Sequence, residues 1–289
     1  MPSGNSADVI AAMAPLSAIA DRRNLSYRIL SGAILGPVTL WLAYVGGIPF
    51  QVALAAVAAV SLGEWLKMTT DKRWPWALPA PFIVLLIYHE AGIAAAIATL
   101  AVLAVMLAVL IGRRSGGLPA PGSFGVIAFG LPYVGLPLLA LAWLRDGAAS
   151  DWKLVFFVLV VIWGTDVGAY FVGRLLGGPR LAPSVSPNKT WSGAIGGGVV
   201  AALVALIWGQ VFSVVAGSVQ LVAVAVMLSF VGQCGDLFES AVKRRYGVKD
   251  SGDLIPGHGG MLDRIDALLA AAPVFAILHA FGLNLGLSP

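Results

Sequence analysis

The chain has 289 residues, of which 59% are hydrophobic and 11% are charged, with 18 Lys and Arg against 14 Asp and Glu. Soluble domains carry about 25% charged residues, so this composition excludes an ordinary soluble protein and indicates a membrane protein. The single cysteine, Cys234, excludes an intrachain disulfide and a cysteine metal cluster, and its apolar neighbours predict a packed core thiol.

Apolar runs recur from Tyr27 to the end of the chain, and they are long enough to cross about 30 Å of hydrocarbon as helices. They predict an all-α, polytopic membrane protein with about nine transmembrane helices. The third of these spans is short and contains two prolines. The expected spans are residues 26–46, 48–67, 76–90, 91–111, 123–144, 152–176, 190–213, 217–240 and 265–286.

The distribution of Lys and Arg predicts the orientation of these spans. If the N-terminus is cytoplasmic, all but Arg145 and Lys153 of the 18 basic residues fall on the cytoplasmic side. Insertion topology alone explains most of this asymmetry, although a basic face also attracts anionic lipids and nucleotides. An odd number of spans places the C-terminal tail outside.

The acidic residues of the predicted spans converge on one depth, near the cytoplasmic surface. Asp236 and Glu239 lie one turn apart in the eighth span, Asp263 and Asp266 lie three apart at the start of the ninth, and Asp166 lies in the cytoplasmic half of the sixth. A buried carboxylate needs a charge partner or a cation, so these acids are candidate metal ligands.

Each acid also has a simpler interpretation. Asp263 can be a helix N-cap, and Asp236 and Glu239 can pair with Lys243. We interpret Glu64 with Lys67 as an ordinary surface pair at i and i+3, and we expect Glu64→Gln to cost little activity.

Two polar cytoplasmic loops are candidate phosphate sites. The loop before the ninth span has a glycine turn at residues 257–260 and is bordered by basic residues that can neutralise phosphates: Lys243, Arg244, Arg245, Lys249 and Arg264. In the loop before the seventh span, Ser186 or Thr190 can cap the helix, and Lys189 lies beside the free N–H groups of its first turn. A capped loop with positive-inside charges is the alternative, and Gly196, Gly197 and Gly198 indicate close helix packing.

Three segments together resemble the signature of phosphatidate cytidylyltransferases, also called CDP-diacylglycerol synthases. They are Ser240-x-x-Lys-Arg-x-x-x-x-Lys-Asp-x-Gly-x-x-Ile-Pro-Gly-His-Gly-Gly-x-x-Asp-Arg-x-Asp266, Asp166-x-Gly-Ala-Tyr-Phe-x-Gly-Arg174 and Ser186-Pro-x-Lys-Thr-Trp191. The resemblance covers residues 160–270. The family pattern in the third segment reads Ser-Pro-Lys-Lys-Thr-Trp-Glu-Gly, so Asn188 and Ser192 depart from it.

The resemblance implies that CTP and phosphatidic acid react to give CDP-diacylglycerol and diphosphate, with Mg²⁺ as cofactor, in phospholipid biosynthesis. The residues fit this chemistry, because metal-bound carboxylates and cations can offset repulsion between two phosphates. The sequence leaves open whether a monovalent cation assists. The resemblance also suggests a homodimer, with the lipid bilayer and the two substrates as partners and no nucleic acid.

We assign the candidate residues as follows. The expected metal ligands are Asp166, Asp236, Glu239, Asp263 and Asp266. The expected substrate-binding residues are Ser186, Lys189, Thr190, Lys243, Arg244, Lys249, Gly259 and Gly260. The expected catalytic residues are Asp236, Asp263, Asp266, Lys189, Lys243, Arg264 and His258, with His258 as a hydrogen-bond donor or loop-shaping residue rather than a base.

Two other functions remain open at this point. An enzyme that transfers to another lipid phosphate, or that phosphorylates a polyprenol, would use similar groups. An ion-coupled transporter also buries acids and breaks helices with glycine, but its polar groups lie near the midplane in paired halves, and we find no second half.

The expected organisation has three parts: a cytoplasmic tail at residues 1–24, N-terminal transmembrane helices at 25–150 and a catalytic transmembrane region at 151–289. The tail lacks a signal-peptide layout, because Arg22 and Arg23 follow its short apolar stretch. We expect a multi-pass protein of the cytoplasmic membrane, which is the inner membrane in a cell with two membranes. We expect its active site to face the cytoplasm.

The charge distribution generates a topological prediction. Reporters fused within residues 113–118 or 177–185 should report a cytoplasmic location, and reporters at Gly46–Gly47 or after Leu287 should report an external one. A cytoplasmic location of the C-terminal reporter would contradict the nine-span topology.

Overall fold

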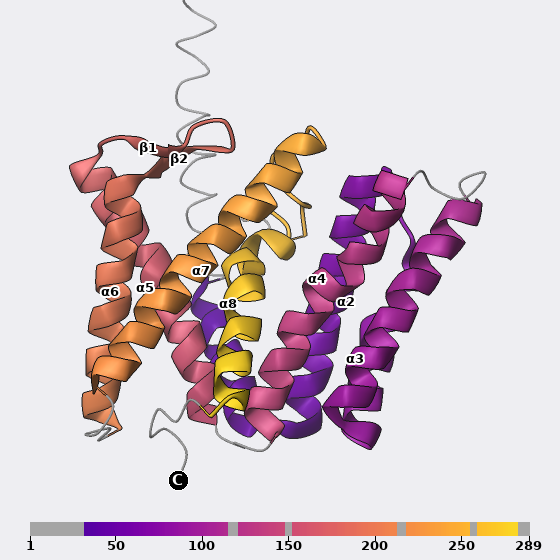
Figure 1. The fold of residues 1–289 in the computed structure, drawn as a ribbon, viewed down its shortest axis with the longest axis horizontal. Coiled ribbons are helices and arrows are strands. Elements are labelled where there is room, and N and C mark those ends of the chain that lie inside the picture. The colour runs from indigo at the N-terminus through magenta and orange to yellow at the C-terminus, as the bar shows by residue number, and fades with distance from the viewer. Residues whose placement is uncertain (1–31, 115–120, 148–151, 213–217, 255–258, 283–289) are drawn as a thin grey trace, which may run out of the picture.

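A computed structural model of the protein describes residues 32–114, 121–147, 152–212, 218–254 and 259–282 (Figure 1). The predicted N-terminal tail lies outside these residues. The described chain is almost entirely helical, which confirms the all-α class, with one small antiparallel sheet in addition.

The first described helix is Gly32–Val45. It is followed by α2 (Gly47–Thr70), the 3-10 helix η1 (Pro75–Ala77), α3 (Ala80–Arg114), α4 (Pro121–Asp146), α5 (Trp152–Leu176), α6 (Trp191–Val211), α7 (Ser218–Arg245) and α8 (Leu262–Ala280). The strands β1 (Arg180–Ala182) and β2 (Ser186–Thr190) form a hairpin between α5 and α6.

Six helices of the described chain are long and apolar enough to cross a membrane: α2, the stretch from η1 to the end of α3, α4, α5, α6 and α7. Helix Gly32–Val45 is apolar but shorter, and α8 has 19 residues. The count of about nine spans therefore stays a prediction.

Helix α3 combines the predicted third and fourth spans and folds back on itself. A straight helix of 35 residues would be about 52 Å long. The guanidinium carbon of Arg114 nevertheless lies 4.9 Å from the centre of the Trp76 ring, just before the helix begins. The reversal occurs at Gly92, whose φ of 82° and ψ of −177° are not helical. The two arms of α3 are thus antiparallel, as two separate spans would be.

Arg145 and Asp146 join the first two described helices at the end of the molecule away from the β hairpin. The Arg145 guanidinium donates to the carbonyl oxygens of Ala43 and Tyr44 at the C-terminal end of Gly32–Val45. The Asp146 carboxylate accepts from the N–H of Gly47 at 3.0 Å, at the start of α2. Each charge has the sign that its helix end favours.

The helices form two groups with α7 and α8 between them (Figure 1). Helices α2, α3 and α4 pack together on one side, and α5 and α6 pack together on the other. Helix α7 runs diagonally across the front from α6, and α8 contacts α2, α4, α5 and α7. This central position lets α8 receive side chains from both groups.

Glycines allow α5 and α6 to approach closely. A Cβ atom at Gly196 would overlap Val172 of α5, and one at Gly197 would lie 3.0 Å from the carbonyl oxygen of Thr165. The prediction that these glycines serve helix packing is therefore confirmed for Gly196 and Gly197. At Gly198 a Cβ would meet nothing within 4 Å.

Candidate active site

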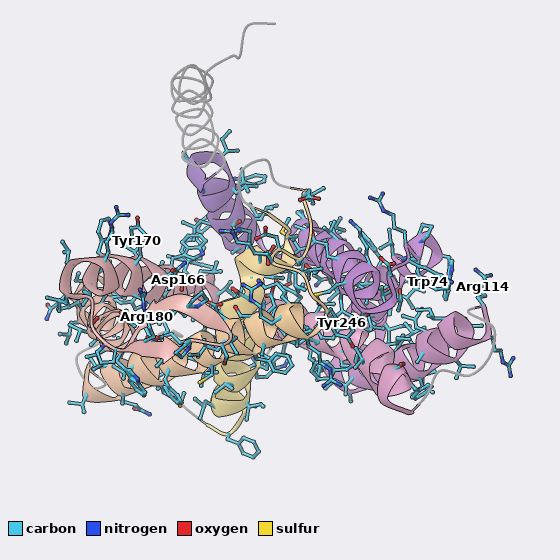
Figure 2. All side chains as sticks on the ribbon, turned by 90° about the horizontal axis from the view of Figure 1, so that it is seen from above. Trp74, Arg114, Asp166, Tyr170, Arg180 and Tyr246 are labelled. Carbon is cyan, nitrogen blue, oxygen red and sulfur yellow. The ribbon has the colours of Figure 1, made fainter. Side chains whose placement is uncertain are left out.

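The predicted site residues gather at one end of the molecule. Figure 1 shows the β1–β2 hairpin, the C-terminal end of α7 and the N-terminal end of α8 at this end. Seen from above, Asp166 and Arg180 lie over the α5–α6 side, Trp74 and Arg114 lie at the opposite side, and Tyr246 lies between them (Figure 2). The elements that surround this central region carry the charged side chains described below.

The β hairpin delivers Lys189 to α7. Strand β2 pairs with β1 so that Arg180 lies opposite Thr190 and Ala182 opposite Ser186. The Lys189 ammonium forms an ion pair with the Asp236 carboxylate, whose other oxygen lies 3.4 Å from the Ser240 hydroxyl. Both members of the ion pair keep more than a quarter of their side chains exposed. They are therefore accessible to a ligand.

Thr190 caps helix α6. Its hydroxyl accepts from the Gly193 N–H at 3.1 Å, which settles the choice between Ser186 and Thr190 as the capping residue. The cap fixes where β2 ends and α6 begins, and so fixes the position of the adjacent Lys189.

Lys243 bridges two acids from different helices. Its ammonium lies 2.6 Å from the Asp263 carboxylate of α8 and 3.2 Å from the Glu239 carboxylate one turn earlier in α7. The Glu239 side chain is fully buried, and neither of its oxygens has a hydrogen-bond partner of good geometry. The positive charge of Lys243 therefore offsets the negative charge of Glu239, although the Glu239 oxygens make no hydrogen bond of good geometry.

Asp263 holds the loop before α8 in place through hydrogen bonds. One of its carboxylate oxygens accepts from the N–H groups of Ser251 at 2.9 Å and Gly260 at 2.8 Å, and it lies 3.0 Å from the Ser251 hydroxyl, whose single proton it shares with Glu64. Burial alone would raise the pKa of Asp263, but hydrogen bonds from Lys243, Gly260 and Ser251 hold it below its usual value. The carboxylate is therefore ionised at neutral pH.

Asp166 and Asp266 complete an acidic cluster. Asp266 lies close enough to Asp236, Glu239 and Asp166 to interact with all three electrostatically, and Asp166 interacts with Asp236, Lys189 and Arg264. A glycine makes this approach possible, because a Cβ at Gly235 would lie 2.9 Å from the carbonyl oxygen of Asp266. Carboxylates of α5, α7 and α8 thus converge as the sequence predicts.

These carboxylates are not arranged as a finished metal centre. Within the described part of the chain, no three acidic, histidine or cysteine side chains lie close enough to share a metal ion. Instead, Lys189 pairs with Asp236, and Lys243 pairs with Glu239 and Asp263, so three of the predicted ligands are held by lysines. The metal assignments stay predictions.

Glu64 does not have the surface role expected from the sequence. It is buried, and its carboxylate accepts from the N–H groups of Met261 at 2.9 Å and Leu262 at 2.8 Å and from the Ser251 hydroxyl at 3.0 Å. The interpretation as an exposed pair with Lys67 was wrong. Its partners lie almost 200 residues away, and helical periodicity carries no signal of such a contact.

The remaining basic candidates differ in their settings. Arg244 donates to the carbonyl oxygens of Val185 and Val248, so it ties the β hairpin to the end of α7. Lys249 and Arg264 are exposed.

Cys234 is exposed in a groove between α6 and α7, so the expectation of a packed core thiol was wrong. His258 and Gly257 lie outside the described residues.

An apolar cavity of about 510 Å³ adjoins the acidic cluster. It lies between helix Gly32–Val45, α2, α4, α5 and α8, and most of its lining side chains are aliphatic or aromatic. Its charged lining residues are Asp166 and Arg264. The cavity therefore has a mostly apolar lining, with the charged side chains of Asp166 and Arg264 at its edge.

Comparison with known proteins shows which family the chain belongs to. The model of the cytidylyltransferase family matches residues 26–281. The chain belongs to this family. It is 40% identical over 269 residues to a phosphatidate cytidylyltransferase of Brucella suis biovar 1 (strain 1330), covering 90% of this chain and 93% of the relative. It is 35% identical over 270 residues to the protein of that name from Bacillus subtilis (strain 168), covering 89% and 98%.

A further relative extends the match to a third bacterial group. The phosphatidate cytidylyltransferase of Pseudomonas aeruginosa (strain ATCC 15692) is 35% identical over 266 residues, covering 88% of this chain and 96% of the relative. The family therefore spans both the helices before residue 150 and the site that follows them.

The converging acids generate a prediction about activity. Asp236→Asn, Asp263→Asn and Asp266→Asn should each lower the turnover number at least about a hundredfold, the scale of losing a preorganised charge in the transition state. Asp71→Asn is the matched control, because Asp71 is exposed and its left-handed conformation suits asparagine. Near-normal turnover of folded Asp263→Asn and Asp266→Asn proteins would reduce these acids to structural roles.

Proposed function

We propose that this protein is a phosphatidate cytidylyltransferase, which transfers the cytidylyl group of CTP to phosphatidic acid and releases diphosphate. One observation carries the proposal: a cluster of ammonium and carboxylate groups lies at the edge of an apolar cavity between membrane-type helices. Such a site can hold a charged nucleotide and a lipid at once. The names of the relatives point to the same pair of substrates.

The reaction makes simple chemical demands. An oxygen of the lipid phosphate attacks the α-phosphorus of CTP, and the bond between that phosphorus and the bridging oxygen to the β-phosphate breaks. The attacking oxygen is already anionic at neutral pH, so no general base is required. The main barriers are repulsion between two phosphates and the charge that develops on diphosphate.

The cationic side chains meet these demands from different directions. We assign Lys189 to the triphosphate, because it is partly exposed and adjoins the first turn of α6. Arg264 is exposed at the cavity edge, where it can contact the lipid phosphate. Lys243 is buried between Glu239 and Asp263, and its contribution is to hold α7 against α8.

The acidic cluster fits a divalent cation in its donor chemistry. Carboxylate oxygens are the ligands that Mg²⁺ prefers, and the buried Glu239 oxygens have no hydrogen-bond partner. Asp236, Glu239 and Asp266, with Asp166 beside them, are the residues that would hold the ion, and they would have to draw closer together to do so, because no three of the described acids lie close enough to share one. A bound Mg²⁺ would neutralise charge on the reacting phosphates. With the ion bound to Asp236, the Lys189 ammonium would be free to contact the nucleotide.

The cavity supplies an acyl-chain site. Its lining by helix Gly32–Val45, α2, α4, α5 and α8 defines a region where a fatty acyl chain would replace contact with bilayer hydrocarbon. Its two charged residues, Asp166 and Arg264, mark where the headgroup would lie. We place the protein in the cytoplasmic membrane with this edge facing the cytoplasm, and a homodimer stays a prediction.

The direct test is to incubate the purified protein in detergent micelles with radiolabelled CTP, Mg²⁺ and one lipid phosphate at a time. We expect labelled CDP-diacylglycerol with phosphatidic acid and no labelled lipid with a polyprenol or a polyprenyl phosphate. Transfer to the polyprenyl substrate instead would contradict the proposal and support a related lipid transferase. A phosphorylated polyprenol made from γ-labelled CTP would support a kinase.

Lys189 gives a second, sharper prediction. Lys189→Ala should raise KM for CTP and also lower kcat, because charge moves onto the departing diphosphate only in the transition state. KM for phosphatidic acid should change much less, and Lys189→Arg should recover only part of the loss. Steady-state kinetics with each substrate varied in turn test this. If only the phosphatidic acid dependence changes, Lys189 contacts the lipid phosphate instead.

A further inference from the structure

Glu64 links the N-terminal helices to the acidic cluster. It belongs to α2, yet its carboxylate accepts three hydrogen bonds from the segment that begins α8: from the N–H groups of Met261 and Leu262 and from the Ser251 hydroxyl. The side chain is 9% exposed, and a buried carboxylate holds its contacts in low dielectric. This contact joins residues 187 to 198 positions apart.

Glu64 supplies a cap that α8 lacks locally. The first N–H groups of any helix have no partner within the helix. Met261 occupies the N-cap position of α8 and makes no side-chain capping hydrogen bond. The Glu64 carboxylate, which belongs to another helix, accepts the hydrogen bonds that a capping side chain would accept. Its negative charge is also favourable at a helix N-terminus. The carboxylate thereby fixes the height and rotation of the first turn of α8.

The contact extends to the acids of the cluster. The Ser251 hydroxyl lies 3.0 Å from Glu64 and 3.0 Å from Asp263, so one serine touches both carboxylates. Asp263 in turn receives Lys243 of α7. These contacts connect Glu64 to α7 as well as to the first two turns of α8, where Asp263, Arg264 and Asp266 lie.

Two glycines leave room for this carboxylate. A Cβ at Gly252 would lie 2.6 Å from one Glu64 oxygen, and a Cβ at Gly260 would lie 2.6 Å from the other. Both distances are too short for real atoms. The loop backbone thus closes around Glu64 from two sides, which a surface carboxylate would not require.

We propose that Glu64 is a positioning residue for the transferase reaction: it sets the register of α8 and so the places of Asp263 and Asp266 relative to α7. The proposal rests on the proposed function for its kinetic consequences. It assigns a role in the reaction to α2, which lies outside the region 151–289 that the sequence predicts to be catalytic.

The test compares Glu64→Gln with Lys67→Gln. Glutamine keeps the size of Glu64 but replaces one acceptor oxygen with an N–H₂ donor, which then faces a backbone N–H or the Ser251 hydroxyl. Lys67 is exposed three residues later on the same helix, so its substitution controls for removing a charge from α2. Ser251→Ala, which removes the hydroxyl shared by Glu64 and Asp263, replaces Glu64→Gln if that protein does not purify in a folded form, and exchange at Met261 and Leu262, whose N–H groups donate to Glu64, is then the deciding measurement.

Two measurements are made on the full chain in detergent micelles. The first is amide hydrogen exchange at residues 259–264. The second is the dependence of the rate of CDP-diacylglycerol formation on Mg²⁺ and CTP concentration. A smaller folded fraction lowers the maximal rate but leaves the half-saturating concentrations unchanged, whereas displaced acids change them.

We expect Glu64→Gln to accelerate exchange at Met261 and Leu262 at least about tenfold, the scale of losing a hydrogen bond to a charged group. It should lower kcat at least about tenfold and raise the half-saturating Mg²⁺ concentration at least about threefold. Ser251→Ala should act in the same direction with a smaller effect, and Lys67→Gln should match the wild type.

Other outcomes overturn the proposal. Unchanged half-saturating concentrations, with or without a lower rate, would make Glu64 a stabilising residue only. Unchanged exchange at Met261 and Leu262 would mean that the carboxylate does not hold α8. If the wild-type protein makes no CDP-diacylglycerol, the proposed function fails, while the exchange experiment still decides whether Glu64 holds α8.

Discussion

The site depends on one buried ammonium group. Lys243 lies between Glu239 and Asp263 with only 10% of its side chain exposed, and the two acids are exposed by 0% and 7%. Two carboxylates that face each other away from water would repel strongly, so α7 and α8 can pack here only while the cation is present. Asp263 can then bind the Ser251 and Gly260 N–H groups, and through this loop the N-terminal end of α8 is fixed.

The other elements of the site are arranged around this contact between α7 and α8. Gly235 brings α7 against α8 beside Asp266, the β hairpin carries Lys189 to Asp236, and Glu64 approaches from α2. Asp236, Glu239 and Asp263 each receive a lysine ammonium, and Asp263, Asp266 and Glu64 accept from backbone N–H groups, while the Glu239 oxygens lack a hydrogen bond of good geometry. The result is a polar site at the edge of an apolar cavity, in which the Lys189–Asp236 pair stays partly exposed.

Much of this was predictable, because the signals are local. Long apolar runs predicted the helices, the polar loop predicted a cap at Ser186 or Thr190, and helical spacing gave the Lys243–Glu239 pair as one interpretation of Glu239. Contacts between distant segments left no periodic signal. The choice of Lys189 rather than Lys243 as the partner of Asp236 depends on the β hairpin, the Glu64 contact depends on how α2 packs on α8, and the reversal of α3 depends on the backbone of one glycine, Gly92. Cys234 was misassigned because an apolar neighbourhood in sequence does not distinguish a core position from an exposed position in a groove.

Thermal unfolding of Lys243→Met in detergent micelles at neutral pH tests this account most directly. Methionine keeps much of the length of lysine without its charge, so Glu239 and Asp263 would be left buried and uncompensated, at a cost of about 3–5 kcal/mol. The account predicts an unfolding midpoint several degrees below that of the wild type, and partial recovery in Lys243→Met/Glu239→Gln, where one of the two acids is also neutral. An unfolding midpoint equal to that of the wild type, or a double variant less stable than Lys243→Met, would contradict it.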